Sequence, residues 1–142
     1  MKSIIFALPI VLFLSSCDND DVVIDQSKLP AEASVYIQSH FNDVKITQAT
    51  KSQDGLSKSY DVYLNSGISL EFTRKGKIES IKSIQRLPDN VIPAKILDYV
   101  SIKHPSEFIT EWEMNNNGQE IKLSNKLELK FNKEGDFIKI DM

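Results

Sequence analysis

An internal repeat constrains the fold of this 142-residue chain more than any other feature of its sequence. The segment PAEASVYIQSHFNDVKIT, residues 30–47, aligns with PAKILDYVSIKHPSEFIT, residues 93–110, at an offset of 63 residues. Farther along, YDVYLNSGISLEFTRKGKI, residues 60–78, aligns with QEIKLSNKLELKFNKEGDF, residues 119–137, at an offset of 59. The offset changes in turn-rich sequence, where loops tolerate a change of length. We therefore expect two copies of one unit, joined in one body because each copy alone is small.

Each copy begins with a predicted helix. Proline is accepted in the first turn of a helix because its missing N–H has no partner there, so the two Pro-Ala pairs mark helix starts. In the first copy Ala33, Ile37, Phe41 and Val44 follow at helical spacing and form one apolar stripe. Ile96 begins an equivalent stripe in the second copy.

Four short strands are predicted after each helix. Apolar and polar residues alternate in YDVYL and SLEFT of the first copy and in LELKF of the second, with NSG, SNK, RKG and KEG as turns. One apolar and one polar face indicate an antiparallel sheet that is covered on one side. The expected fold class is α+β: two tandem α-β4 repeats, residues 29–84 and 85–142, share an antiparallel sheet of roughly eight strands with both helices packed on one face.

The same stretches resemble a known family. LPAEASVYIQSHF, YDVYLNSGISLEFTRKGKI, IPAKILDYV and IKLSNKLELKFNKEGDFIKID look like segments of the PepSY-like, β-lactamase-inhibitor-like proteins, which are secreted or lipid-anchored bacterial proteins with two tandem repeats. The resemblance covers nearly all of residues 29–142. It implies tandem α-β4 units on a curved sheet, and it makes protein binding a reasonable expectation, since the related PepSY module is associated with holding peptidases in check. Similarity to an inhibitor fold does not establish inhibition.

The N-terminus has the pattern of a lipoprotein precursor. Lys2 precedes the apolar run IIFALPIVLFL, which is too short to span a bilayer and is typical of a signal-peptide core. The LSSC that follows resembles a bacterial lipobox, which implies cleavage before Cys17, the only cysteine, and acylation of its thiol. We expect residues 1–16 to be a lipoprotein signal peptide; a plain secretory signal is the alternative.

The acidic run DNDD follows Cys17 directly. Clustered like charges repel one another, so we expect a solvated tether over residues 17–28. The run also resembles the signal that sends lipoproteins to the cell surface in some Gram-negative bacteria. The expected location is the bacterial cell envelope, as an outer-membrane lipoprotein that faces the periplasm or the cell surface and contacts the membrane through its acyl anchor.

The composition argues against several classes of function. A formal net charge of −3 and a pI near 5.4 leave no basic excess for binding nucleic acid. A single cysteine forms neither an internal disulfide nor a thiolate metal cluster. His40 and His104 lack the spacing of metal ligands and the acid-histidine-nucleophile pattern of catalysis. We expect no catalytic residue, no metal site, no cofactor and no enzymatic activity.

The best candidate for a functional surface is the uncovered face of the sheet. By alternation, this face should present the side chains of Asp61, Tyr63, Glu71, Thr73, Glu128 and Lys130. Tyr63 is aromatic on an otherwise polar face, and aromatic residues are common interface anchors. Trp112, the only tryptophan, is either a further anchor of this partner-binding face or a core residue, and most tryptophans are largely buried.

Three functions remain open. The principal hypothesis is a non-enzymatic, inhibitor-like module that binds an envelope protein or peptide through this face. A hydrolase of envelope polymers is the second, and it would need two close carboxylates in a deep pocket. A purely accessory or structural lipoprotein is the third, and it would have neither a cavity nor an apolar patch.

Overall fold

The computed structural model describes residues 21–54 and 57–141, so the predicted signal peptide and Cys17 lie outside the described residues. The described part contains two α-helices, two 3₁₀-helices and nine strands. In chain order these are β1 (Val22–Ile24), η1 (Gln26–Lys28), α1 (Ala31–His40), β2 (Ile46–Asp54), β3 (Ser57–Leu64), β4 (Ser69–Thr73), β5 (Ile78–Lys82), η2 (Asp89–Val91), α2 (Ala94–Lys103), β6 (Ile109–Asn115), β7 (Gly118–Leu123), β8 (Glu128–Phe131) and β9 (Phe137–Asp141).

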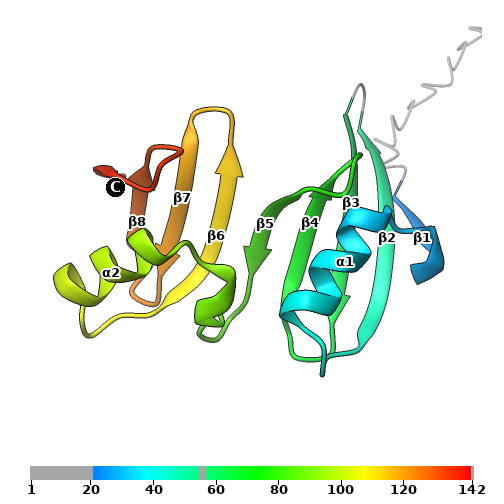
Figure 1. The fold of residues 1–142 in the computed structure, drawn as a ribbon, viewed down its shortest axis with the longest axis horizontal. Helices are drawn as coiled ribbons and strands as arrows, with labels where there is room; N and C mark the ends of the chain where they lie inside the picture. Colours follow the sequence, from blue (N-terminus) through cyan, green and yellow to red (C-terminus); the bar gives the residue numbers. More distant parts are fainter. Residues whose placement is uncertain (1–20, 55–56, 142) are drawn as a thin grey trace, which may run out of the picture.

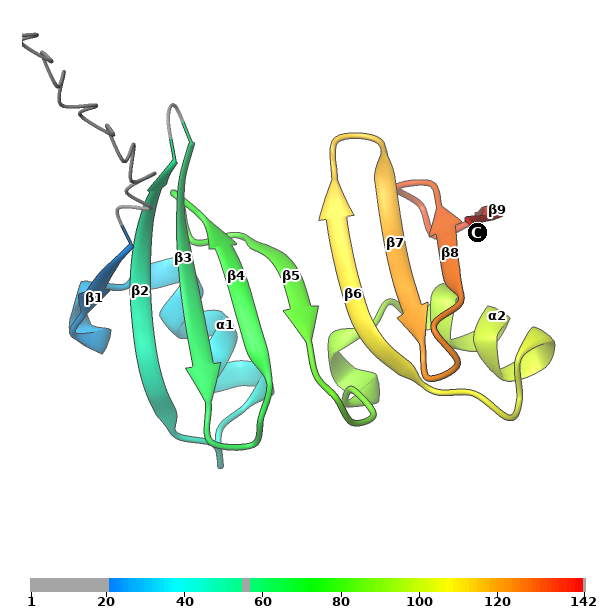
Figure 2. The ribbon, with the colours of Figure 1, turned by 180° about the vertical axis from the view of Figure 1, so that it is seen from behind.

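All nine strands form one antiparallel sheet, and their order in the sheet is their order in the chain. Figures 1 and 2, which view the molecule from opposite sides, show α1 and α2 on the same face of this sheet. α1 lies against the half that contains β2–β5, and α2 lies against the half that contains β6–β9. The expected α+β class, with helices on one face of an antiparallel sheet, is therefore confirmed.

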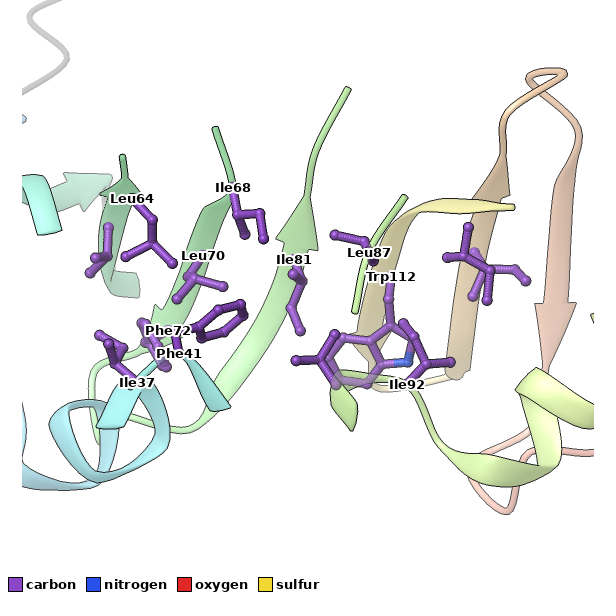
Figure 3. Packing of buried hydrophobic residues seen from close by; sticks show 14 of the residues in the cluster. Ile37, Phe41, Leu64, Ile68, Leu70, Phe72, Ile81, Leu87, Ile92 and Trp112 are labelled. Atoms are coloured by element: carbon purple, nitrogen blue, oxygen red, sulfur yellow. The ribbon is translucent and has the colours of Figure 1, made fainter. Parts of the chain in front are cut away.

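One row of directly paired residues crosses the whole sheet on the helix-covered face. Its members are Ile24, Ala49, Val62, Leu70, Ile81, Trp112, Ile121, Leu129 and Ile140. The seven inner members are buried, with exposed fractions of 6% or less. Figure 3 shows this core passing from β4 through Ile81 of β5 to Trp112 of β6. Because β5 pairs with β6, both the sheet and the core are continuous between the two halves.

The helices pack through the stripes that the sequence predicts. Ala33, Ile37 and Phe41 are buried at α1, and Ile96 and Val100 are buried at α2. Each helix begins directly after a proline, which suits proline because the residue before the first turn needs no helical N–H bond. Within the ranges 21–54 and 57–141, no helix has the length and apolar character needed to cross a membrane.

The glycines of the RKG and KEG turns have positive φ angles, as tight turns require. Gly76, between β4 and β5, and Gly135, between β8 and β9, have φ angles of 89° and 85°. Each glycine lies against the start of the helix that covers its half of the sheet, Gly76 against α1 and Gly135 against α2. In both halves, therefore, a turn with a glycine of positive φ packs against the start of the covering helix.

The structure also contains a strand that the sequence did not predict. Residues 17–28 were expected to be a tether and the folded body to begin near Leu29, but Val22–Ile24 form β1 and pair with β2. The carboxylate of Asp25 then accepts a hydrogen bond from the Ser27 N–H and caps η1. The tether prediction is wrong for residues 22–28, and the sheet has nine strands instead of roughly eight. A three-residue strand is stabilised by its neighbour in the sheet, which a local pattern does not reveal.

Candidate functional site

The face of the sheet opposite the helices carries six of the predicted site residues. One row of directly paired residues crosses it: Val23, Thr50, Asp61, Glu71, Ser80, Glu113, Glu120, Lys130 and Lys139. A second row on this face contains Gln48, Tyr63, Ser69, Lys82, Glu111, Lys122, Glu128 and Asp141. Thr73 follows Glu71 two residues along β4 and therefore shares its face. We call this surface the open face.

Tyr63 is the aromatic side chain that the open face exposes most clearly. It is 45% exposed, and its direct neighbours across the sheet are Gln48 and Ser69. A tyrosine ring among short polar side chains offers a partner both apolar area and a hydroxyl group. The structure thus places Tyr63 where an anchor would need to be, while its role in binding stays a prediction.

Trp112 does not belong to the open face. It lies in the core row between Ile81 and Ile121 and is 6% exposed. Its indole Nε1–H donates a 2.9 Å hydrogen bond to Oε1 of Gln119, which is itself buried. The interpretation of Trp112 as part of the partner-binding face is wrong, and its interpretation as a core residue is confirmed. The register decides this, because Trp112 faces the helix layer.

Charges on the part of the open face formed by β6–β9 are paired with one another. Nζ of Lys122 lies 3.0 Å from Oε1 of Glu128 and 3.5 Å from Oε1 of Glu111. The hydrogen bond that Lys122 donates to Glu128 raises the pKa of Lys122, and the bond from Lys130 to Asp141 raises the pKa of Lys130. Two of the predicted site residues, Glu128 and Lys130, are therefore already engaged within the sheet.

Carboxylates nearer the middle of the sheet lack such partners. Among the described residues, Asp61, Glu71 and Glu113 form no ion pair. Burial raises the pKa of Glu71, the negative charges of Asp61, Glu79 and Glu113 raise it further, and Lys82 opposes them. Burial also raises the pKa of Asp61. Burial is the larger cause of both shifts, and neighbouring carboxylates add to it.

A cavity opens beside these carboxylates, at the junction of the two halves. β5 and β6 pair over three residues each, and beyond the pair formed by Ser80 and Glu113 the strands diverge. The cavity there has a volume of about 700 Å³, and we call it the seam cavity. Its lining consists of Glu71, Thr73, Lys77, Ile78, Glu79, Ser80, Glu113, Met114, Asn115, Asn116 and Lys133.

Ser80 is the unusual residue of the seam cavity. It is only 3% exposed, and its Oγ has no hydrogen-bond partner in the part of the chain that the structure describes. Sequence reasoning missed both Ser80 and Glu113 as site residues. The alternation of β5 could have placed Ser80 on the open face, but no local signal shows that β5 and β6 are neighbours.

Other candidate features lack converging chemistry. A second cavity of about 750 Å³ lies between α1, η1 and β2, and the charged residues in its lining are Asp25 and Lys45. The His40 ring stacks on Tyr36 with centroids 4.2 Å apart, and His104 ends α2. Within residues 21–54 and 57–141, no group of three or more His, Cys, Asp or Glu side chains is placed to hold a metal ion.

Comparison with known proteins identifies the family. The family model described as "Putative beta-lactamase-inhibitor-like, PepSY-like" matches residues 58–139. The chain belongs to this PepSY-like family. Among curated proteins, none matches it.

Solved structures of similar proteins extend the PepSY-like comparison to most of the chain. A Bacteroides thetaiotaomicron protein described as calcium-regulated and periplasmic is 35% identical, with a TM-score of 0.82 over 87% of this chain and 98% of that one. A periplasmic protein of the DUF2874 family from Bacteroides vulgatus is 34% identical, with a TM-score of 0.80 over 88% and 99% of the two chains. The resemblance that the sequence motifs suggested is confirmed.

Proposed function

We propose that this PepSY-like protein is a non-enzymatic binding module of the bacterial cell envelope, which docks a protein or peptide on its open face in the manner of an inhibitor. The observation that carries the proposal is the asymmetry of the sheet. Both helices cover one face, and the other face presents an exposed tyrosine and two rows of polar side chains. Tyrosine is enriched at protein interfaces, and the rim around such an anchor is polar.

The location proposed for this module is the periplasmic side of the outer membrane or the cell surface. The periplasmic descriptions of its structural relatives support an extracytoplasmic location. The lipobox-like LSSC supports an acyl anchor on Cys17. Two or more acyl chains hold a protein on a membrane effectively permanently, so Cys17→Ser should move the protein from the membrane fraction to the soluble fraction. Unchanged membrane association would contradict the anchor.

We further propose that the two halves are tandem copies of one α-β4 unit. The offsets in the sequence support this, as does the order of elements, in which α1 precedes β2–β5 and α2 precedes β6–β9. The positive φ angles of Gly76 and Gly135 at corresponding turns add a backbone correspondence. Under this proposal the β5–β6 junction is the one place on the open face that a single copy could not form.

Site-specific crosslinking in cells tests the open face as the docking surface. A photoreactive amino acid is placed at Tyr63 on the open face and, as a matched control, at Val35, which is 61% exposed on α1. We expect a discrete crosslinked adduct from position 63 and none from position 35. Adducts from position 35 alone, or none from position 63 in correctly localised protein, would refute docking on this face.

A further inference from the structure

We propose that the seam cavity receives an arginine side chain of the docked partner, with Glu71, Ser80 and Glu113 as the acceptors of its guanidinium group. This inference rests on the proposed function and deepens it, because it gives the partner a chemistry. The occupant is a basic protein segment, and the binding mode is insertion of one cationic side chain at the junction of the two halves.

The first argument is geometric. Ser80 is paired directly with Glu71 on one side and with Glu113 on the other, so the three side chains stand in line on the same face of adjacent strands. Neighbouring strands are about 4.8 Å apart, which puts the backbones of the two glutamates about 10 Å from each other with the serine midway. All three residues line the seam cavity.

The second argument is the unpartnered hydroxyl group. Ser80 is only 3% exposed, and its Oγ makes no hydrogen bond to any described residue. Buried polar groups in proteins are nearly always hydrogen-bonded, so an orphaned hydroxyl on a residue that lines a cavity calls for a ligand or an ordered water. A ligand with N–H donors would satisfy Ser80 Oγ and leave its O–H free to donate to a flanking carboxylate.

The third argument is charge. Asp61 lies beside Glu71 in the same row, and Glu79, which lines the cavity, occupies the irregularity of β5 next to Ser80. The lysines in its lining, Lys77 and Lys133, form no ion pair among the described residues. With three glutamates and two lysines, the lining has a formal charge of −1. The β6–β9 part of the open face pairs several of its acids with lysines, whereas Glu71 and Glu113 at the seam form no ion pair among the described residues.

The shape of the acceptor set favours a guanidinium group over a metal ion. Arginine presents five N–H donors in one plane, and these can reach carboxylates on two sides while a third acceptor lies below. A calcium ion needs six to eight oxygens about 2.3–2.6 Å away, which requires the carboxylates to converge on one point. The acids here are anchored on different strands of the sheet, and they suit the wider cation.

A peptide titration of the full chain tests the site. The probe is acetyl-Gly-Arg-Gly-amide, and its control is the same peptide with citrulline, which keeps the shape of arginine and lacks its charge. We expect the arginine peptide to shift the NMR signals of residues at the seam and to bind at least about tenfold more tightly than the citrulline peptide. Glu113→Gln and Glu71→Gln should each weaken binding by about tenfold, since each removes a charged acceptor.

Glu128→Gln is the matched control, because Glu128 lies on the same face but is paired with Lys122. Equal binding of both peptides would overturn the site, because the charge of the guanidinium group would then contribute nothing. Equal losses from Glu128→Gln and Glu113→Gln would overturn it in favour of diffuse electrostatic attraction. Saturation of the same signals by calcium chloride, with no response to the arginine peptide, would overturn it in favour of a metal ion. Crosslinking at position 63 without arginine binding would refute this inference alone, whereas arginine binding without crosslinking would refute the proposed function alone.

Discussion

Replacing Trp112 by phenylalanine tests the assignment of this residue to the core. Trp112 is 6% exposed, and its indole N–H donates a 2.9 Å hydrogen bond to Oε1 of Gln119. Nε2 of Gln119 in turn donates to the backbone carbonyl of Lys133, 3.1 Å away. The substitution shortens the side chain and removes the donor, so a buried oxygen of Gln119 loses its partner.

The expected loss of stability follows from these two changes. An unsatisfied buried acceptor costs about 1–3 kcal/mol. The smaller ring adds about 1 kcal/mol, a fraction of the roughly 3–5 kcal/mol lost when a buried aromatic residue is cut to alanine. Trp112→Phe should therefore lower the free energy of unfolding by about 2–4 kcal/mol. This is a large share of the roughly 5–15 kcal/mol that stabilises a typical domain.

A double-mutant cycle separates the hydrogen bond from the packing. Urea unfolding followed by far-UV circular dichroism gives the free energy of unfolding for Trp112→Phe, Gln119→Leu and the double variant. We expect the loss of stability in the double variant to be about 1–3 kcal/mol smaller than the sum of the losses in the single variants. The reason is that each single change leaves the polar group of the other residue buried without its hydrogen-bond partner. A stability within about 0.5 kcal/mol of wild type for Trp112→Phe, together with loss of crosslinking at position 63, would refute the core assignment and restore Trp112 as an anchor.

Three further predictions concern single residues. Burial raises the pKa of Tyr36 to about 12 in the folded protein, above its ordinary value near 10. The stability that the neutral phenol contributes is therefore full below pH 10 and falls as pH rises toward 12, by up to about 2 kcal/mol in total. Tyr36→Phe should remove this decline in unfolding curves recorded from pH 8 to 12. Glu71→Gln should raise the free energy of unfolding at neutral pH. The raised pKa of Glu71 means that its charged form is disfavoured in the folded state, and glutamine removes that charge. A destabilised variant would show instead that Glu71 supports the fold. Gly118→Ala should lower the melting temperature more than Gly67→Ala. Both glycines have a positive φ angle, which costs alanine about 1–2 kcal/mol in the left-handed region of Gly67. A Cβ on Gly118 would also lie 2.2 Å from the carbonyl oxygen of Phe131, whereas nothing lies within 4 Å of one on Gly67. Equal shifts in melting temperature would contradict this account.

Local patterns predicted the elements of the fold well. The stripe of Ala33, Ile37 and Phe41 is buried as expected, because helical spacing alone decides which side chains share a face. Alternation likewise placed Tyr63 and Glu71 on the face away from the helices, since successive residues of a strand point to opposite sides. These inferences need no knowledge of what lies across the sheet.

Inferences that needed a partner strand were less successful. β1 was missed because a three-residue strand depends on pairing with β2, which the residues of β1 do not encode locally. Trp112 was left undecided between anchor and core because its less regular surroundings in sequence did not fix its face. The seam cavity was missed because it exists only where β5 and β6, from the two halves of the sheet, come together.

The sequence by itself determined the family, the periods of the helices and of the regularly alternating strands, the turns, and the face on which the residues of those strands lie, since all of these depend on short-range spacing. Tertiary structure alone decided which strands are neighbours and in which register they pair. That register puts Glu71, Ser80 and Glu113 in one line, leaves the serine hydroxyl buried without a partner and turns Trp112 into the core. The physical reason is that cross-strand contacts join residues far apart in the chain, and their energies appear only once the sheet has formed.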